Sequence, residues 1–214
     1  MNFKDATVLV TGASAGIGKE FARQFHGLGS SLILVARRED RLRDACDEFN
    51  KIRDGSARFF CVDLAKDDER MEELLSYIRG NRIDILVNNA GRGSFGYFHT
   101  LSLDDELEMV ALNVSATLKL SHSVIPQMKE RRSGAIISVS SVVGFQPLPF
   151  MATYAATKVF NLNHALSLRH ELSEYGIRVL TVCPGPTETE FKGVANLSGI
   201  RIAVMPQSSP HRSA

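Results

Sequence analysis

"TGASAGIG", residues Thr11 to Gly18, lies between a short apolar run and a segment whose apolar residues have helical spacing. Gly12, Gly16 and Gly18 have the spacing G-x-x-x-G-x-G, which is related to the dinucleotide-binding fingerprint but does not copy it. Glycine allows a tight turn and a close approach of the backbone to a ligand, and a helix N-terminus offers free N–H groups to a phosphate. The stretch therefore predicts a phosphate-binding turn between a strand and a helix, with an ordinary tight turn as the alternative.

Six short apolar runs recur along the chain, with helical patterns between them. They are continuously apolar rather than alternating, as expected of strands that are covered on both faces. The runs are Ala6 to Gly12, Ser31 to Arg37, Ala57 to Asp63, Ile83 to Gly91, Gly134 to Ser141 and Ile177 to Gly185. Strands that alternate with helices predict an α/β fold with a Rossmann-type, doubly wound parallel sheet in a single domain.

The composition is that of an ordinary globular chain. Its 214 residues are 44% hydrophobic and 23% charged, and the net charge of +1 gives no electrostatic reason to expect nucleic acid or a membrane surface as a partner. Cys46, Cys61 and Cys183 are scattered, odd in number and without metal-ligand spacing, so we expect no metal and a reduced, intracellular chain. The N-terminus lacks the apolar region of a signal peptide, and no apolar stretch approaches the ~20 residues of a membrane span. We expect a cytoplasmic protein.

Two arginines follow the second apolar run, in "VARRED". This is where an NAD-preferring protein places an acid against the ribose 2′-hydroxyl, whereas an NADP-preferring one uses an arginine for the 2′-phosphate. Arg37 and Arg38 therefore favour NADP(H) over NAD(H), and Glu39 and Asp40 directly behind them weaken that inference. The alternative is a pair of solvated arginines that begins a charged helix.

"TYAATK", Thr153 to Lys158, places a phenol and an ammonium four residues apart. On a helix, Tyr154 and Lys158 would lie on one face, one turn apart. A nearby cation favours the phenolate and lowers the pKa of a tyrosine, which would make Tyr154 a proton-transfer residue. A surface pair on a helix is the alternative.

Five features together agree in type and order with a known family. They are the glycine stretch, Asp63 at the end of the third run, "NNAG" (Asn88 to Gly91) at the end of the fourth, Asn113 within a predicted helix, and Ser141 thirteen residues before Tyr154. From Thr7 to about Phe191 the chain resembles the short-chain dehydrogenases/reductases. "PGPTET" after the sixth run is similar to the family as well.

The resemblance implies roles for four residues. Tyr154 resembles the general acid that protonates a carbonyl oxygen, and Lys158 the lysine that lowers its pKa and holds the nicotinamide ribose. Ser141 resembles the residue that hydrogen-bonds the substrate oxygen, with Ser138 and Ser140 as lesser candidates. Asn113 resembles the asparagine that anchors a water in a proton relay through Lys158.

The resemblance also implies the cofactor contacts. Asp63 and the "NNAG" backbone would meet the adenine, and Thr189, with Thr187 as its rival, would meet the nicotinamide carboxamide. The full set of expected contacts is Gly12, Ser14, Gly16, Ile17, Gly18, Arg37, Arg38, Asp63, Asn89, Ala90, Gly91, Tyr154, Lys158, Pro184, Gly185, Thr187 and Thr189.

The end of the chain differs from the family pattern, which continues with helices that cover the substrate and then a last strand. We expect a dinucleotide-binding domain over residues 1–191 and a short atypical tail over 192–214, in which "GIRIAVMP" could supply one more strand. Apolar residues near the expected mouth suggest an apolar carbonyl or alcohol substrate, although they could equally pack the core. They are Phe95, Phe98, Pro147, Phe150 and Met151.

The leading hypothesis is an oxidoreductase that transfers a hydride between NADP(H) and a carbonyl or alcohol. The alternative is a dinucleotide-binding protein with little turnover because its substrate lid is missing. An epimerase or dehydratase of the extended relatives is a weaker third, because their G-x-x-G-x-x-G loop is not found. The family further implies a homodimer or homotetramer packed through two long helices, here about residues 103–132 and 152–175.

Overall fold

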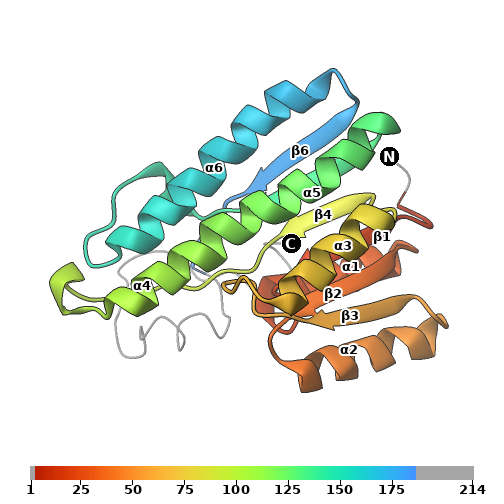
Figure 1. The fold of residues 1–214 in the computed structure, drawn as a ribbon, viewed down its shortest axis with the longest axis horizontal. Helices are drawn as coiled ribbons and strands as arrows, with labels where there is room; N and C mark the ends of the chain where they lie inside the picture. Colours follow the sequence, from red (N-terminus) through yellow and green to blue (C-terminus); the bar gives the residue numbers. More distant parts are fainter. Residues whose placement is uncertain (1–2, 187–214) are drawn as a thin grey trace.

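The computed structural model describes residues 3–186 of the chain and forms an α/β sandwich around one sheet (Figure 1). The strands are β1 (Thr7–Thr11), β2 (Ser31–Ala36), β3 (Ala57–Cys61), β4 (Ile85–Asn88), β5 (Gly134–Val139) and β6 (Ile177–Val182). The α-helices are α1 (Gly16–Gly27), α2 (Glu39–Ile52), α3 (Glu69–Gly80), α4 (Leu103–Val110), α5 (Ala116–Glu130) and α6 (Ala152–Ser173). Three short turns of helix complete the set: η1 (Phe98–Thr100), η2 (Ala111–Ser115) and η3 (Val142–Phe145).

The sheet has the order β3-β2-β1-β4-β5-β6, and each neighbouring pair is parallel. Val8 of β1 pairs with Leu32 on one side and with Ile85 on the other, so the strand order reverses between β1 and β4. In such sheets ligands bind beyond the carboxyl ends of the strands at this switch point. The predicted doubly wound parallel fold is confirmed.

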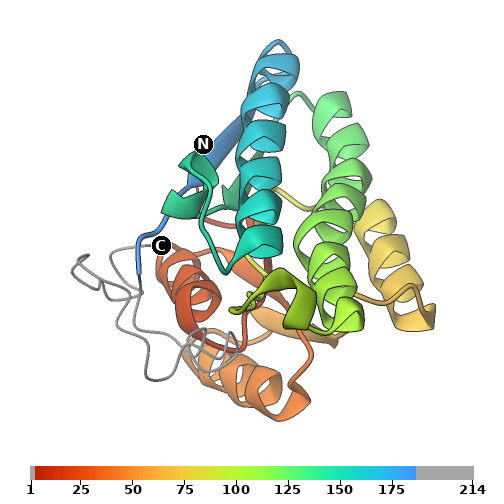
Figure 2. The same ribbon diagram turned by 90° about the vertical axis from the view of Figure 1, so that its left-hand side faces the viewer.

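Two apolar cores cover the two faces of the sheet. Side chains alternate along each strand, so Leu9 joins the core beneath α3, α5 and α6, whereas Val8 and Val10 join the core beneath α1 and α2. Figure 2 shows α3, α5 and α6 side by side on one face. The strands β1, β2 and β4 are covered on both faces, which explains their continuously apolar sequences. The edge strand β6 differs, because Arg178 and Leu180 are exposed on one of its faces.

The element boundaries differ from the predicted ones at two places. Asp63 does not end β3 but follows its last residue, Cys61, by two positions. The helix predicted over residues 103–132 is three segments, α4, the π-helical η2 and α5, which follow one another without a break. Thr187, Thr189, the domain boundary at residue 191 and the strand in "GIRIAVMP" lie outside the described residues. None of the helices in the described part of the chain is both long enough and apolar enough to cross a membrane.

Candidate active site

The glycine stretch forms the turn from β1 into α1. Gly12 and Gly16 have φ values of 65° and 56°, in the left-handed region that glycine adopts without strain. A Cβ on Gly12 would lie 2.7 Å from the side-chain nitrogen of Asn89, so the turn packs directly against the end of β4. The N-cap of α1 is Ala15, which provides no side-chain cap, and the first turn carries no acid. Uncapped N–H groups at a helix N-terminus fit a phosphate, and thus a dinucleotide cofactor.

Thr11, at the end of β1, fastens this turn to β4. Its hydroxyl accepts hydrogen bonds from the backbone N–H groups of Asn89 and Ala90, both at 2.9 Å, and donates to Val87 O at 3.1 Å. The Asn89 amide donates back to Thr11 O at 2.8 Å. Thr11 was not among the predicted site residues, although a threonine directly before a glycine turn is a sequence signal for such a role. These hydrogen bonds fix the ends of β1 and β4 relative to each other.

Arg37 and Arg38 follow β2 and have different partners. The guanidinium of Arg38 donates to the Ser14 hydroxyl from Nε at 3.3 Å and from Nη2 at 3.0 Å, which brings it onto the glycine turn. The Nη1 of Arg37 instead lies 3.8 Å from Asp63 and 3.5 Å from Glu108. The structure therefore groups Ser14 with Arg38, and Asp63 with Arg37.

Ser141, Tyr154 and Lys158 lie together beyond the carboxyl end of β5. Tyr154 and Lys158 are on α6, one turn apart as predicted, and both are buried. The Ser141 and Tyr154 side chains share a hydrogen bond. The Lys158 Nζ lies 5.8 Å from the centroid of the Tyr154 ring and donates to Val139 O at 2.9 Å. The geometry thus joins a hydroxyl, a phenol and an ammonium at one edge of the sheet.

The expected pKa shift of Tyr154 is wrong in direction. Burial raises the pKa of Tyr154 to about 12, and the hydrogen bond with Ser141 opposes this without reversing it. Burial also lowers the pKa of Lys158 to about 8, against the opposing influence of the nearby Cys183 thiol. The error arose because the sequence showed the spacing of the two groups but not the removal of both from water, which penalises each charged form.

Asn113 lies in η2, and its side chain holds the segment after β4. Its Oδ1 accepts from Arg92 N at 3.0 Å, while its Nδ2 donates to Arg92 O at 2.9 Å and to the Thr157 hydroxyl at 3.0 Å. A Cβ on Gly91 would come within 3.1 Å of Asn113 Oδ1 and 3.5 Å of Lys158 Nζ. Asn113, Gly91 and Lys158 are therefore neighbours, as the predicted site requires. Arg92 and Thr157 were missed, since their contribution depends on contacts between distant segments.

The structure also shows where the other two candidate serines and the segment after β6 lie. The Ser140 hydroxyl donates to Lys158 O at 2.7 Å, and Ser138 is buried, so of the three serines it is Ser141 that shares a hydrogen bond with the phenol. Pro184 O accepts from the Ser141 hydroxyl at 3.4 Å, which brings the start of "PGPTET" to the site. Of the other expected contacts, Ile17 is partly buried against the core under α1, and Gly185 directly follows Pro184 near the end of the described residues.

Comparisons with known proteins agree with this geometry. The family model of the short chain dehydrogenases matches residues 6–197. An uncharacterized oxidoreductase of Thermotoga maritima is 37% identical over 190 residues, covering 89% of this chain and 75% of that protein. A very-long-chain 3-oxoacyl-CoA reductase of Neurospora crassa is 37% identical over 180 residues, which are 82% of this chain but only 54% of the relative. A solved short-chain dehydrogenase from Sphingobium yanoikuyae in complex with NADPH has a TM-score of 0.89 at 34% identity, covering 97% of this chain and 80% of its own.

Proposed function

The chain belongs to the short-chain dehydrogenase family, and from this premise we propose that it transfers a hydride between NADP(H) and a carbonyl or alcohol substrate. The observation that carries the proposal is the hydrogen bond between Ser141 and Tyr154 beside the ammonium of Lys158. NADPH, when bound, would supply the hydride. The chain itself would supply binding, orientation and the proton.

Reduction places negative charge on the carbonyl oxygen as it proceeds. A hydrogen bond from the Ser141 hydroxyl and a proton from Tyr154 would meet this charge as it forms. The raised pKa of Tyr154 keeps the phenol protonated at neutral pH, so it is available as a donor. Once the proton has left, the Lys158 ammonium, 5.8 Å from the ring centroid, would stabilise the negative charge of the phenolate. Asn113 would hold the segment after β4 against α6.

A preference for NADPH over NADH is supported by the contact between Arg38 and Ser14. The guanidinium and the hydroxyl meet at the edge of the glycine turn, where their donors together could hold a 2′-phosphate. The NADPH complex of the Sphingobium relative agrees with this choice of cofactor. The uncapped N-terminus of α1 would hold the pyrophosphate.

The test of the proposal is oxidation of NADPH with a broad panel of carbonyls, which should include apolar ketones. Tyr154→Phe removes the proton donor and keeps the ring, so turnover should fall roughly 10²–10⁴-fold while NADPH affinity stays nearly unchanged. Tyr175→Phe, two residues beyond the end of α6, is the matched control and should keep its activity. Near-normal turnover in Tyr154→Phe would contradict the assignment.

The second candidate is a dinucleotide-binding protein with little turnover. NADPH binding without turnover across the whole panel would support it over the enzyme. The two candidates share the glycine turn and Arg38, so the binding measurement alone does not separate them.

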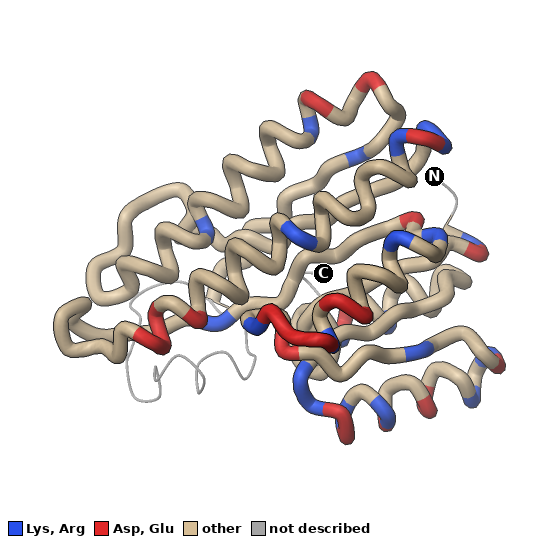
Figure 3. The backbone as a smooth tube through the Cα atoms, viewed as in Figure 1, with Lys and Arg blue, Asp and Glu red and all other residues tan. Residues whose placement is uncertain are grey.

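We also propose a cytoplasmic homodimer formed through α5 and α6. Leu118 on α5 and Val159 and Leu166 on α6 are exposed, although all three are apolar. Figure 3 shows few charged residues along the middle of these two helices. Apolar, weakly charged helix faces are typical of interfaces between subunits.

A further inference from the structure

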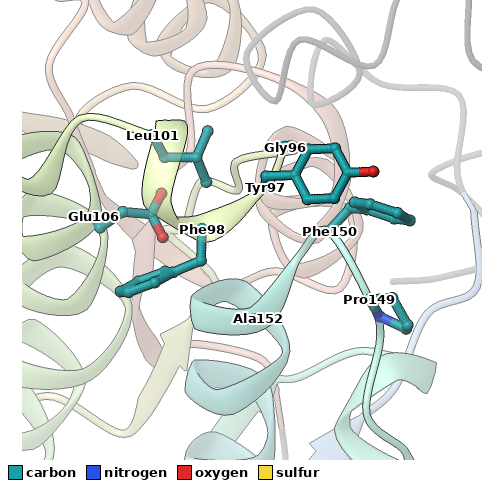
Figure 4. Close-up of a pocket in the computed structure, with 8 residues that line it drawn as sticks. All are labelled: Gly96, Tyr97, Phe98, Leu101, Glu106, Pro149, Phe150 and Ala152. Atoms are coloured by element: carbon teal, nitrogen blue, oxygen red, sulfur yellow. The ribbon is translucent and has the colours of Figure 1, made fainter.

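A pocket lies between the segment after β4 and the segment before α6. It has a volume of about 240 Å³. Gly96, Tyr97, Phe98, Leu101, Glu106, Pro149, Phe150 and Ala152 line it (Figure 4). The two segments are tied by a hydrogen bond from Gly96 N to Phe150 O at 2.8 Å. None of these side chains takes part in the proposed hydride or proton transfer, although Phe98 and Phe150 are among the apolar residues expected near the mouth of the substrate site.

Glu106 is the charged residue of the pocket. Its side chain projects from α4 and ends between Phe98 and Leu101 (Figure 4). The residue is only 4% exposed, and within residues 3–186 neither of its carboxylate oxygens has a hydrogen-bond partner. The nearby guanidinium of Arg92 pairs with Asp105 and Glu108 on the same helix instead. A buried carboxylate without a donor is costly, and a cation that enters the pocket would remove that cost.

Aromatic rings form the outer wall of the pocket. The Tyr97 and Phe150 rings meet edge to face with centroids 5.1 Å apart, and Phe98 lies next to the carboxylate (Figure 4). Tyr97 and Phe98 are more than half exposed, so this wall can be reached from solvent. The faces of aromatic rings attract cations, and quaternary ammonium ligands are often held in such surroundings.

We propose that this pocket binds a small alkylammonium ion, with Glu106 as its counter-charge and the Tyr97, Phe98 and Phe150 rings around its alkyl groups. The volume is smaller than the roughly 300–1,000 Å³ of pockets for drug-sized ligands, so it suits a compact head group. Ala152 lines the pocket, whereas Tyr154, two residues later, is about 200° around α6. The Ala152 and Tyr154 side chains thus leave α6 in different directions, but the two sites are neighbours: Phe150 contacts Phe95, which packs against the apolar cluster that contains Tyr154.

The N-terminus of α6 offers a simpler explanation for the burial of the Glu106 carboxylate. A helix N-terminus favours a nearby acid, and Ala152 is the first residue of α6. That explanation accounts for a charge at this position but leaves both oxygens without a donor. It also predicts that an uncharged side chain would weaken the fold, which the experiment measures.

The experiment titrates the NADPH-loaded protein with choline, and separately with the uncharged alcohol in which carbon replaces the quaternary nitrogen. Calorimetry should detect choline and not the alcohol. Glu106→Gln keeps the shape of the side chain and should weaken choline binding about tenfold or more, as expected for loss of a hydrogen bond or ion pair to a charged group. Asp104→Asn removes an exposed carboxylate from the same helix and should leave the affinity unchanged.

Three results would overturn the proposal. Equal binding of choline and the alcohol would show that the pocket recognises the apolar groups and not the charge. Absence of choline binding to the wild type would show that the pocket does not bind this ion at all. A lower melting temperature of ligand-free Glu106→Gln would indicate a structural partner, because loss of an unpaired buried charge should leave stability equal or higher. None of these measurements requires turnover, so they remain decisive even if the proposed reaction fails.

Discussion

Arg38 and Arg37 are adjacent in sequence, but their contacts give them different expected effects on cofactor choice. Arg38 bonds the Ser14 hydroxyl on the glycine turn, whereas Arg37 lies between two carboxylates. We expect Arg38→Ala to weaken NADPH binding about 10–100-fold, the scale of one or two lost hydrogen bonds to a phosphate, and to change NADH binding little. Fluorescence titration with both cofactors measures this. Arg37→Ala is the control, and a larger NADPH defect there would reverse the assignment.

The buried pair on α6 gives a prediction for stability against pH. The pKa of Lys158 falls from 10.5 to about 8 on burial, so the unfolded chain binds more protons than the folded one between these values. The free energy of unfolding should therefore rise with pH in this window, by about 3 kcal/mol at most from this residue. The raised pKa of Tyr154 has the opposite effect: its contribution is present below pH ~10 and is lost as pH rises toward 12.

Urea denaturation at intervals between pH 8 and 10 tests the lysine part of this prediction. Lys158→Met should flatten the rise of the unfolding free energy relative to the wild type, because the group that releases its proton on folding is gone. Lys51→Met, which replaces a lysine on the outside of α2, should keep the wild-type slope. Parallel curves for Lys158→Met and the wild type would show that burial does not shift the lysine.

At the scale of elements, the local sequence was sufficient to predict the strands but not the π-helical segment that carries Asn113. Strands covered on both faces are continuously apolar, so "ATVLVTG" and "GAIISVSS" predicted β1 and β5 to within one or two residues. Tyr154 and Lys158 could be placed together because helical spacing is a local property. The π-helical η2 has no such signal, since its geometry depends on what Asn113 reaches across the fold. The burial of Glu106 in the first turn of α4 could not be predicted from the sequence either, because it also depends on contacts between distant segments.

Asn113 should stabilise the fold by joining η2 to Arg92 and Thr157, independently of any role in the reaction. Asn113→Ala leaves the Arg92 backbone without its partner and removes one of the two hydrogen bonds of the Thr157 hydroxyl, so we expect a loss of roughly 2–4 kcal/mol in the free energy of unfolding. Asn81→Ala removes an exposed amide that donates only to Tyr77 O and should cost under about 1 kcal/mol. Equal losses in the two variants by urea denaturation would refute this stabilising role of Asn113.

At the scale of the whole molecule, the sheet sets which surfaces remain for partners. Val179 of β6 packs beneath α6, so its neighbour Leu180 points to the other face, where it is 57% exposed. The residues that we propose for catalysis and cofactor binding follow the carboxyl ends of β1, β2, β4 and β5 or lie at the start of α6. The α5 and α6 helices run along one face of the sheet (Figure 1). A subunit interface on these two helices would therefore leave the mouth of the site open.

Light scattering of the wild-type protein at micromolar concentration should give the mass of a dimer or a multiple of it. Leu166→Glu places a charge on the exposed apolar face of α6, and it should weaken association at least about tenfold, because each copy loses a buried leucine and gains a buried charge. Ser167→Glu adds the same charge at the next position, about 100° around the helix, and should leave the mass unchanged. A monomeric wild type, or dissociation by both variants alike, would remove α6 from the interface.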